Sequence, residues 1–348
     1  MTKPKFSRRL TAAAMAAGMA LSLPLGTAQA QEKPGEGTTV KMGQATWDTG
    51  WFHAAIYKKL LEDLGYTVEG PTTLDNPPFY QAMAQGDLDL WVNGWFPLHN
   101  TYESTFSNGA EKIGYVAKGG ALEGYLVDKA SVEKFDIKTL DDFKRDEVKK
   151  AFDRDGDGKA DLVACPPGWG CEVTIEHHLD AYGLRDSVNP IKASYAASMA
   201  DAVAAHGEGK PILFYTWTPN WTVDVLKPGK DVVWIEVPKV DLPEAQKSLE
   251  DAATMAGVAG CVEDPCRLGF PANDIRPVAN SEFVKENPAA KVLLEEVSIP
   301  IADIFAQNAT MNKGEGDSED IARHADEWVE AHADLVKGWL DKARTAAD

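Results

Sequence analysis

The sequence predicts an α/β protein of two lobes, each with a mostly parallel sheet flanked by helices. Strand and helix patterns alternate along two separate stretches, and such alternation is typical of parallel sheets. Subtracting a leader of 30 residues from 348 leaves 318, which suits two domains of roughly 150 residues each. We assign 38–124 and 239–348 to lobe 1 and 125–238 to lobe 2.

The first 30 residues have the pattern of a secretory signal peptide. Basic residues precede an apolar stretch, and Ala28-Gln29-Ala30 has the small-x-small form that a signal peptidase cleaves. The alternative is a membrane anchor, but the stretch is short for a span and contains Pro24 and Gly26. We therefore expect residues 1–30 to be removed after Ala30, the protein to be exported, and 31–37 to form a flexible leader.

The first alternation covers residues 38–92. Apolar residues at Phe52, Ile56 and Leu60 have helical spacing, and Gly65 ends the pattern. Alternating residues such as Val40 and Met42 favour a strand before this helix. The patterns predict strands at 38–45, 66–68 and 88–92 and helices at 50–65 and 77–84.

The second alternation covers residues 124–237, and the last third of the chain is rich in helical patterns. Strands are predicted at 124–127, up to about 164, at 212–216 and at 232–237, with helices at 140–152, 171–182 and 198–206. Further helices are predicted at 281–286, 289–297 and about 318–346. Ligands of open α/β sheets bind beyond the carboxyl ends of strands, so the residues after each strand are the first candidates for a site.

Tryptophans follow several of these strands. Trp95, Trp169 and Trp217 stand in three post-strand loops, and Trp47 and Trp51 follow the first strand. A single tryptophan is usually a packing residue, but several on one side of the sheets favour a ligand site. The π-face of tryptophan attracts cations, so the pattern indicates a site for a quaternary ammonium group.

A second group of residues is suited to an anion. Cys171 begins a predicted helix, so the backbone N–H groups of Gly170 and Cys171 point into the loop, and helix N-termini bind carboxylates. His99 can also donate to a carboxylate, more strongly if protonated. A cation site beside a carboxylate site predicts a zwitterionic ligand such as a betaine.

The four cysteines occur in two close pairs, Cys165/Cys171 and Cys261/Cys266. In an exported protein such pairs indicate disulfides. The alternative is a metal site, but the spacing is not C-x-x-C. The first pair brackets Trp169, so its bridge is expected to fix the shape of the tryptophan loop.

A loop rich in aspartate precedes the Cys165 segment. Asp153, Asp155, Asp157 and Asp161 stand at the first, third, fifth and ninth positions of an EF-hand loop. The twelfth position is Ala164 rather than the bidentate glutamate. The alternatives are a structural Ca²⁺ site and a polar turn before a strand; no cofactor is required otherwise.

Four segments resemble the glycine betaine-binding proteins of ABC-type osmoprotectant importers: GDLDLWVNGWFPLHN, DRDGDGKADLVACPPGWGCE, FYTWTPNW and LKPGKDVVWIEVP. The resemblance covers nearly all of the chain from about Val40. It implies a two-lobed periplasmic binding protein of type II with the ligand in the cleft between the lobes. It also implies an ammonium box at Trp95, Trp169 and Trp217, a carboxylate held by His99 and by the N–H groups of Gly170 and Cys171, and a bridge between Cys165 and Cys171.

Two features depart from the family pattern. The segment ATWDTGWF is unusually rich in tryptophan, and in related choline binders a tryptophan near this position joins the cage, so Trp47 or Trp51 could alter specificity. The segment CVEDPC adds a second cysteine pair. Choline, dimethylsulfoniopropionate and trimethylamine oxide therefore stay open as ligands, although a carboxylate site disfavours the first and the last.

We expect a periplasmic, monomeric binding protein that delivers its ligand to a membrane permease. An exported hydrolase is the rival class, but the sequence contains no G-x-S-x-G or H-E-x-x-H motif and no convincing triad. Removing the four positive charges of the leader from a net charge of −19 leaves about −23. Such a charge repels nucleic acid and anionic lipid, so neither is an expected partner.

Overall fold

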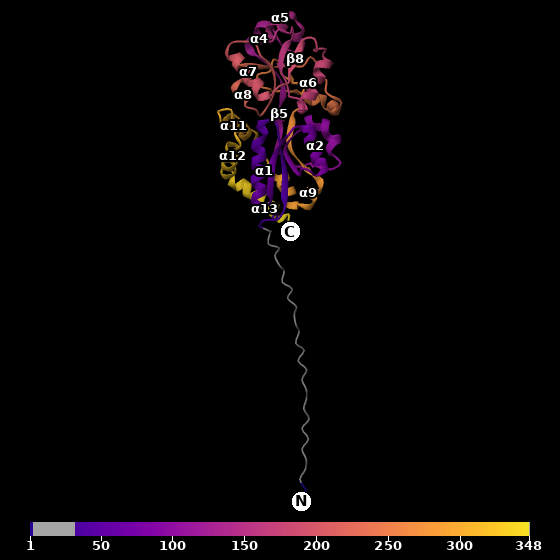
Figure 1. Cartoon of the computed structure of the whole chain (residues 1–348), viewed down its shortest axis with the longest axis vertical. Helices are drawn as coiled ribbons and strands as arrows, with labels where there is room; N and C mark the ends of the chain where they lie inside the picture. Colours follow the sequence, from indigo (N-terminus) through magenta and orange to yellow (C-terminus); the bar gives the residue numbers. More distant parts are fainter. Residues whose placement is uncertain (3–31, 348) are drawn as a thin grey trace.

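The computed structural model describes residues 1–2 and 32–347, arranged as two lobes with one sheet in each (Figure 1). Residues 3–30 of the predicted signal peptide, including its predicted cleavage site, lie outside the described residues. No helix in the described part of the chain combines the length and apolar character that crossing a membrane requires.

The first lobe contains a six-stranded sheet of order β2-β1-β3-β13-β4, with β5 paired to β13. Its strands are β1 (Thr39–Ala45), β2 (Thr67–Leu74), β3 (Leu90–Phe96), β4 (Ala110–Lys112), β5 (Ala117–Ala121) and β13 (Asn273–Asn280). Helices α1 (Trp51–Asp63), α2 (Asn76–Gln85), α3 (Glu103–Phe106), α9 (Ser281–Glu286), α10 (Pro288–Glu296), α11 (Ile301–Met311), α12 (Ser318–Ala331) and α13 (Ala333–Thr345) belong to this half of the molecule, with 3-10 turns η1 (Asp48–Gly50) and η2 (Leu98–Tyr102).

The second lobe contains a five-stranded sheet of order β10-β6-β9-β7-β8. Its strands are β6 (Glu123–Asp128), β7 (Ala160–Val163), β8 (Val188–Ile191), β9 (Leu213–Trp217) and β10 (Val232–Ile235). Helices α4 (Lys129–Phe135), α5 (Asp146–Phe152), α6 (Gly170–Ala181), α7 (Tyr195–Gly207) and α8 (Thr222–Val225) and the turn η3 (Leu140–Lys144) surround it.

Both sheets are mixed, whereas the sequence predicts mostly parallel sheets. The pairs β1–β2, β1–β3, β7–β8 and β7–β9 are parallel. The strands that enter each sheet from the other lobe, β6 and β13, pair antiparallel with their neighbours. The chain passes from β5 to β6 through the single residue Leu122, so the two sheets are joined closely at this point.

The return connection between β10 and β13 contains η4 (Glu244–Ala253) and a small hairpin of β11 (Thr254–Met255) and β12 (Cys266–Arg267). Trp234 of β10 donates its N–H to the carbonyl of Gly260 at 2.9 Å and accepts from Val262 at 3.0 Å. Part of the segment after 238, which the sequence analysis assigns to lobe 1, therefore packs against the second sheet.

Several predicted elements differ from the observed ones. The predicted helix 318–346 is two helices separated at His332, whose φ of −111° is not helical. The predicted helix 140–152 is divided at Arg145, which is extended. The predicted flexible leader contains ordered backbone, because Gly35 donates its N–H to the carbonyl of Leu64 at 2.9 Å.

Two strands extend further than predicted, and this changes the position of two tryptophans. The sequence predicts strands that end at Val92 and Thr216, but β3 continues to Phe96 and β9 to Trp217. Trp95 and Trp217 therefore lie on the last residues of strands rather than in loops. Sheet hydrogen bonding consequently fixes the backbone from which each ring projects, and packing fixes the ring itself.

Candidate functional site

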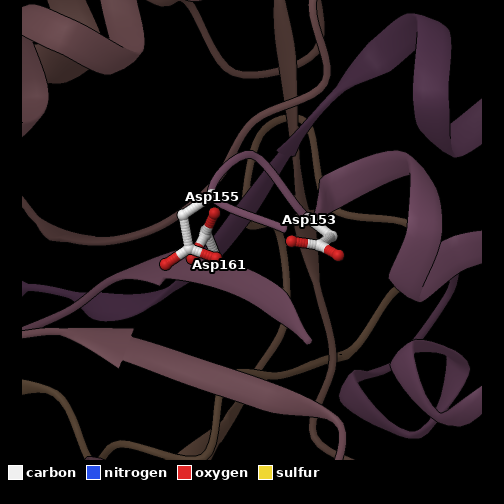
Figure 2. Close-up of side chains that lie close together, drawn as sticks. All are labelled: Asp153, Asp155 and Asp161. Atoms are coloured by element: carbon white, nitrogen blue, oxygen red, sulfur yellow. The ribbon is translucent and has the colours of Figure 1, made fainter. Parts of the chain in front are cut away.

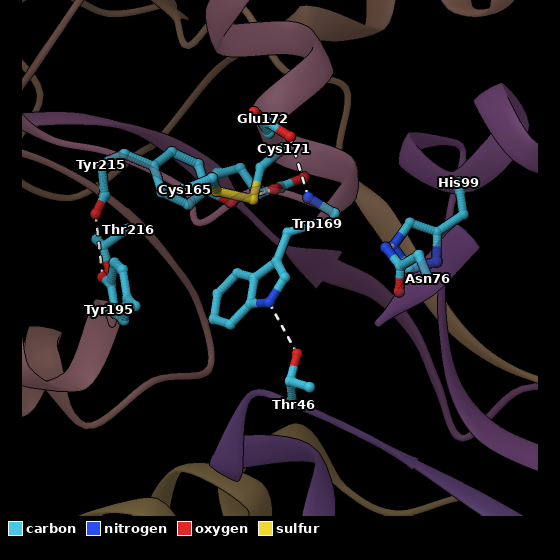
Figure 3. The surroundings of a disulfide bond; sticks show 12 residues. Thr46, Asn76, His99, Cys165, Trp169, Cys171, Glu172, Tyr195, Tyr215 and Thr216 are labelled. Carbon is cyan, nitrogen blue, oxygen red and sulfur yellow. Dashed lines mark hydrogen bonds between the residues drawn. A yellow bond between two sulfur atoms is a disulfide. The ribbon is translucent and has the colours of Figure 1, made fainter. Parts of the chain in front are cut away.

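The segment from Cys165 to Cys171 is a rigid support for Trp169. The structure joins the two cysteines, with Cα atoms 6.0 Å apart, a normal separation for a disulfide. Gly168 has a φ of +90°, which glycine adopts without steric cost, and its N–H donates to Glu172 Oε2 at 3.0 Å. Trp169 immediately precedes helix α6, so its ring is fixed at the start of that helix (Figure 3).

The ring of Trp169 reaches from the second lobe to the first. Its indole Nε1 donates to Thr46 Oγ1 at 2.9 Å (Figure 3), and Thr46 directly follows β1. The Thr46 hydroxyl in turn donates to Asp75 Oδ1 at 2.7 Å. The lobes are therefore in contact through this tryptophan.

Aromatic side chains line a cavity between the lobes. Trp47 and Trp169 stand with ring centroids 5.2 Å apart at an angle of 68°, and Trp169 and Trp217 stand 5.6 Å apart at 74°. Such near-perpendicular rings form the walls of a box. The cavity is lined by these three tryptophans together with Trp95, His99, Gly170 and Cys171 among others. Seven of the predicted site residues thus surround one cavity.

Asn93 holds two of these rings through a single oxygen. Its Oδ1 accepts from Trp47 Nε1 at 2.6 Å and from Trp95 Nε1 at 3.0 Å. Its Nδ2 contacts His53 Nδ1 at 2.6 Å, and burial lowers the pKa of His53 to about 3, so this ring is neutral and can accept. Asn93 is not among the sequence-predicted site residues, because the predicted strand ends at Val92. Continued alternation would have placed Asn93 and Trp95 on one face.

Trp217 and Trp51 have different positions. Trp217 donates from Nε1 to Thr49 Oγ1 at 3.3 Å, and the ring of Tyr195 lies behind it at 4.7 Å. Trp51 donates to the carbonyl of Ala45 at 2.9 Å, is only half-buried and does not line the cavity. Of the two additional candidates from the first loop, the structure therefore brings only Trp47 to the cavity.

His99 is buried and neutral. The backbone N–H of Trp95 donates to His99 Nδ1 at 3.1 Å, and the Tyr80 hydroxyl contacts the same atom at 2.8 Å. We therefore assign the ring proton to Nε2. Burial lowers the pKa of His99 to about 3, so the stronger donation that protonation would give is absent near neutral pH.

The environment of His99 Nε2 also includes the amide of Asn76. Nε2 lies 3.2 Å from Asn76 Nδ2, while Asn76 Oδ1 is buried and has no hydrogen-bond partner among the described residues. The amide oxygen and nitrogen of asparagine have nearly the same shape, so they are assigned from hydrogen bonding. Exchanging them makes the amide oxygen the acceptor of the Nε2 proton in this structure, consistent with the tautomer assigned above, and a ligand carboxylate would have to replace that oxygen as the acceptor.

Gly170 of the second lobe lies directly against His99 of the first lobe, and both residues line the cavity. A Cβ atom at this position would stand 2.7 Å from His99 Cδ2 and 3.1 Å from His99 Nε2, so only glycine fits. Gly170 and Cys171 are the first residues of the 12-residue helix α6, whose first N–H groups lack intrahelical partners. The His99 Nε2 proton and the positive end of this helix therefore face the same small space.

Three residues that are not among the sequence-predicted site residues also line the cavity: Leu98, Glu123 and Tyr215. The Tyr215 hydroxyl donates to Glu123 Oε1, and Asn273 Nδ2 donates to Glu123 Oε2 at 2.6 Å. Burial raises the pKa of Glu123 to about 7, although both hydrogen bonds oppose this shift. An acidic residue directly before the apolar run of β6 was the available signal in the sequence.

The aspartate loop lies away from this cavity. Asp153, Asp155 and Asp161 place one carboxylate oxygen each within 4.8 Å of one another (Figure 2), whereas Asp157 is not part of the group. Oxygen ligands suit Ca²⁺. However, all three carboxylates already accept backbone N–H groups, for example that of Gly156 at 2.7 Å for Asp153, so the loop is also satisfied as a turn.

The second cysteine pair is joined as well, with Cα atoms of Cys261 and Cys266 6.1 Å apart. It closes the hairpin segment that packs against Trp234. It does not line the cavity, so its effect on a ligand is indirect at most.

Two α/β lobes with an aromatic cavity between them define a periplasmic binding protein. The family model for the substrate-binding domain of the ABC-type glycine betaine transport system matches residues 38–331, and the chain belongs to this family. The relatives described below are substrate-binding transport proteins and not enzymes. The two that are similar in sequence are periplasmic proteins.

The chain is 41% identical to the glycine betaine-binding periplasmic protein OusX of Dickeya dadantii (strain 3937), over 93% of this chain and 96% of that protein. It is 39% identical to the glycine betaine/proline betaine-binding periplasmic protein of Salmonella typhimurium, over 93% and 96%. The glycine betaine/L-proline-binding protein of Borrelia burgdorferi has the same fold, with a TM-score of 0.69, 18% identity and coverage of 89% and 100%.

Proposed function

We propose that this protein is the periplasmic receptor of an ABC importer and that it binds glycine betaine or a closely related methylated zwitterion. The observation that carries the proposal is the cavity itself, in which tryptophan faces stand beside the His99 ring and the start of helix α6. Membership of the glycine betaine family supports the same ligand class.

The tryptophans suit the cationic end of such a ligand. A quaternary ammonium group has no N–H to donate, so it is recognised by π-faces rather than by hydrogen bonds. The indole N–H groups of all four tryptophans donate to protein oxygens, so each ring is held by its edge. Their faces are consequently available for methyl groups.

His99 and helix α6 suit the carboxylate end. The neutral His99 ring offers its Nε2 proton, and the N–H groups of Gly170 and Cys171 lie at the positive end of the helix dipole. Choline and trimethylamine oxide lack a carboxylate, so we expect both to bind more weakly than glycine betaine. Dimethylsulfoniopropionate has both ends and is the alternative that this arrangement leaves open.

We infer that the protein acts by capture and delivery, as a monomer, and has no catalytic activity or required cofactor. Its relatives are substrate-binding transport proteins. Ligand contacts on both sides of the cavity would favour the closed arrangement of the lobes, and the closed form would be the one that the permease accepts. Turnover of betaine or choline esters would contradict this inference.

Calorimetry against a panel of small solutes tests the proposed ligand. We expect glycine betaine to bind more tightly than choline, trimethylamine oxide and the isostere 3,3-dimethylbutanoate, which keeps the carboxylate but has an uncharged carbon in place of the ammonium nitrogen. Equal binding of the isostere would mean that the cavity is a hydrophobic slot without cation–π recognition.

A pair of tryptophan variants tests the role of the cavity walls. Trp169→Ala should weaken glycine betaine binding at least about tenfold, because one desolvated cation–π face contributes up to about 2 kcal/mol and each decade in affinity is about 1.4 kcal/mol. Trp169→Phe should cost less. Trp51→Ala is the matched control, since Trp51 lies near the cavity but outside its lining. Equal losses in Trp169→Ala and Trp51→Ala would contradict the assignment.

A further inference from the structure

Glu123 is a buried carboxyl group in an otherwise aromatic cavity. It is the first residue of β6 and is only 1% exposed. In the sheet it stands opposite Trp217 of β9, and both residues line the cavity. A buried carboxylate normally has a positively charged partner, because burying an isolated charge is costly.

The observed partners of Glu123 carry no charge. Its oxygens accept hydrogen bonds from the Tyr215 hydroxyl of β9 and the Asn273 amide of β13. Asn273 is itself oriented by the N–H of Leu98, which donates to its Oδ1 at 2.9 Å. Among the described residues that line the cavity, none is lysine or arginine. Neither these hydrogen-bond partners nor the described lining of the cavity therefore supplies a positive partner for this carboxylate.

We propose that Glu123 selects ligands that carry a positive charge, and that such a ligand binds together with loss of the Glu123 carboxyl proton. The proposal rests on the proposed function, because it requires a cationic group in this cavity. The proton leaves the carboxyl oxygen for solvent, and the ligand cation replaces it as the balancing positive charge. An opposite charge within about 4–6 Å favours the ionised form of a carboxyl group.

The direction in which ligand affinity changes with pH follows from Glu123 and the groups that face it. Burial raises the pKa of Glu123 to about 7, so part of the ligand-free protein is protonated near neutral pH. Tyr215 of β9 and Tyr125 of β6 have pKa values raised well above their usual range by burial, and His99 of η2 has a pKa of about 3. None of these three titrates between pH 5.5 and 8.5, and Asn273 of β13 has no titratable group. Affinity should therefore rise with pH through about 7.

Calorimetry of the intact exported protein with glycine betaine tests the proposal. Titrations in phosphate and in Tris, whose ionisation enthalpies differ, report the protons exchanged on binding. We expect release of a fraction of one proton near pH 7, and an affinity that falls by up to about tenfold per pH unit below the transition, the limit for one linked proton. Affinity that is constant from pH 5.5 to 8.5, with no proton exchange, would overturn the proposal.

Two variants separate charge selection from a purely structural role. Glu123→Gln keeps the size of the side chain but removes its charge, so proton release should disappear and binding of glycine betaine should weaken at least about tenfold, while 3,3-dimethylbutanoate loses much less. Tyr215→Phe removes one donor to the carboxylate but keeps the charge, so the pH transition should move upward and persist. Unchanged proton release in Glu123→Gln would refute the role of Glu123.

Failure of this proposal is distinguishable from failure of the proposed function. Tight binding of glycine betaine without proton release leaves the receptor function intact and removes only the role of Glu123. Absence of glycine betaine binding by the unmodified protein at every pH would instead contradict the proposed function itself.

Discussion

Gly170→Ala should separate ligand affinity from folding stability. The added Cβ would stand 2.7 Å from His99 Cδ2 and 3.2 Å from Leu98 Cδ2, whereas carbon atoms pack at about 3.5–4.0 Å. His99 is buried and held at Nδ1 by the N–H of Trp95, so it cannot turn away freely. The lobes would have to open at this point by roughly 1 Å to restore ordinary contact.

Under the proposed function, the cost of this opening falls on the carboxylate end of the site. Hydrogen bonds to a charged group contribute about 1.5–3 kcal/mol each, so losing one should weaken glycine betaine binding about ten- to a hundredfold, at 1.4 kcal/mol per decade. Each lobe should fold normally, because alanine is the better helix former by about 1 kcal/mol and Gly170 is the first residue of α6. We therefore expect lower affinity with an unchanged or slightly raised melting temperature.

Calorimetry and thermal unfolding of ligand-free protein measure the two effects. Gly338→Ala in helix α13 is the control, because a Cβ at this exposed position meets nothing within 4 Å. That variant should gain stability and keep its affinity. Binding by Gly170→Ala within twofold of the unmodified protein would refute the reasoning, and so would a fall in melting temperature as large as the loss of affinity.

Three other predictions follow from the structure. Replacing Cys165 and Cys171 by serine should weaken ligand binding more than replacing Cys261 and Cys266, although both bridges span short loops and each contributes about 2 kcal/mol to stability; equal affinities would leave the first bridge as a simple staple. Stability should decrease as pH falls from about 6.5, because burial lowers the pKa of three histidines (His53, His99 and His178) to about 3, and each contributes up to about 1.4 kcal/mol per pH unit. The raised pKa of Glu123 opposes this loss above about pH 4.5. A free energy of unfolding in urea that is constant from pH 6.5 to 4 would contradict the predicted decrease in stability. If the aspartate loop holds Ca²⁺, a chelator should lower the melting temperature and added calcium should restore it, whereas no change in either direction would indicate an ordinary turn.

The sequence predicts elements well where local periodicity determines them. Helices α1 and α9 begin and end within two residues of their predicted bounds. Strand β13 is missed because Pro277 interrupts its pattern and its partners are distant in sequence. The helix break at His332 contains no glycine or proline that would mark it in the sequence. Instead, the His332 ring stacks on Trp328 with centroids 4.3 Å apart, and its Nε2 lies 3.4 Å from Asp303. Contacts of this kind come from tertiary packing and cannot be read from local spacing.

The same limit applies to the site. The tryptophans are visible in sequence because large aromatic residues are unusual in loops, and the Gly-Cys helix start is visible because a cysteine pair brackets Trp169. Asn93 and Glu123 are ordinary polar residues, and they become candidates only when the sheets bring them to the cavity. The protonation of His99 likewise depends on burial. An exposed histidine would be partly protonated near neutral pH, whereas burial keeps His99 neutral.

The hydrogen bonds of the tryptophan edges explain how the cavity is completed. Trp47 and Trp95 donate to Asn93 within the first lobe, so this half of the box exists without the second lobe. Trp169 and Trp217 belong to the second lobe but donate to Thr46 and Thr49, which flank Trp47 in the first. These rings reach their positions only when the lobes meet, and the hydrogen bonds use ring edges that a ligand does not need. Under the proposed function, lobe closure and cation recognition depend on the same two tryptophans through different atoms, so a ligand that engages their faces would favour the closed state.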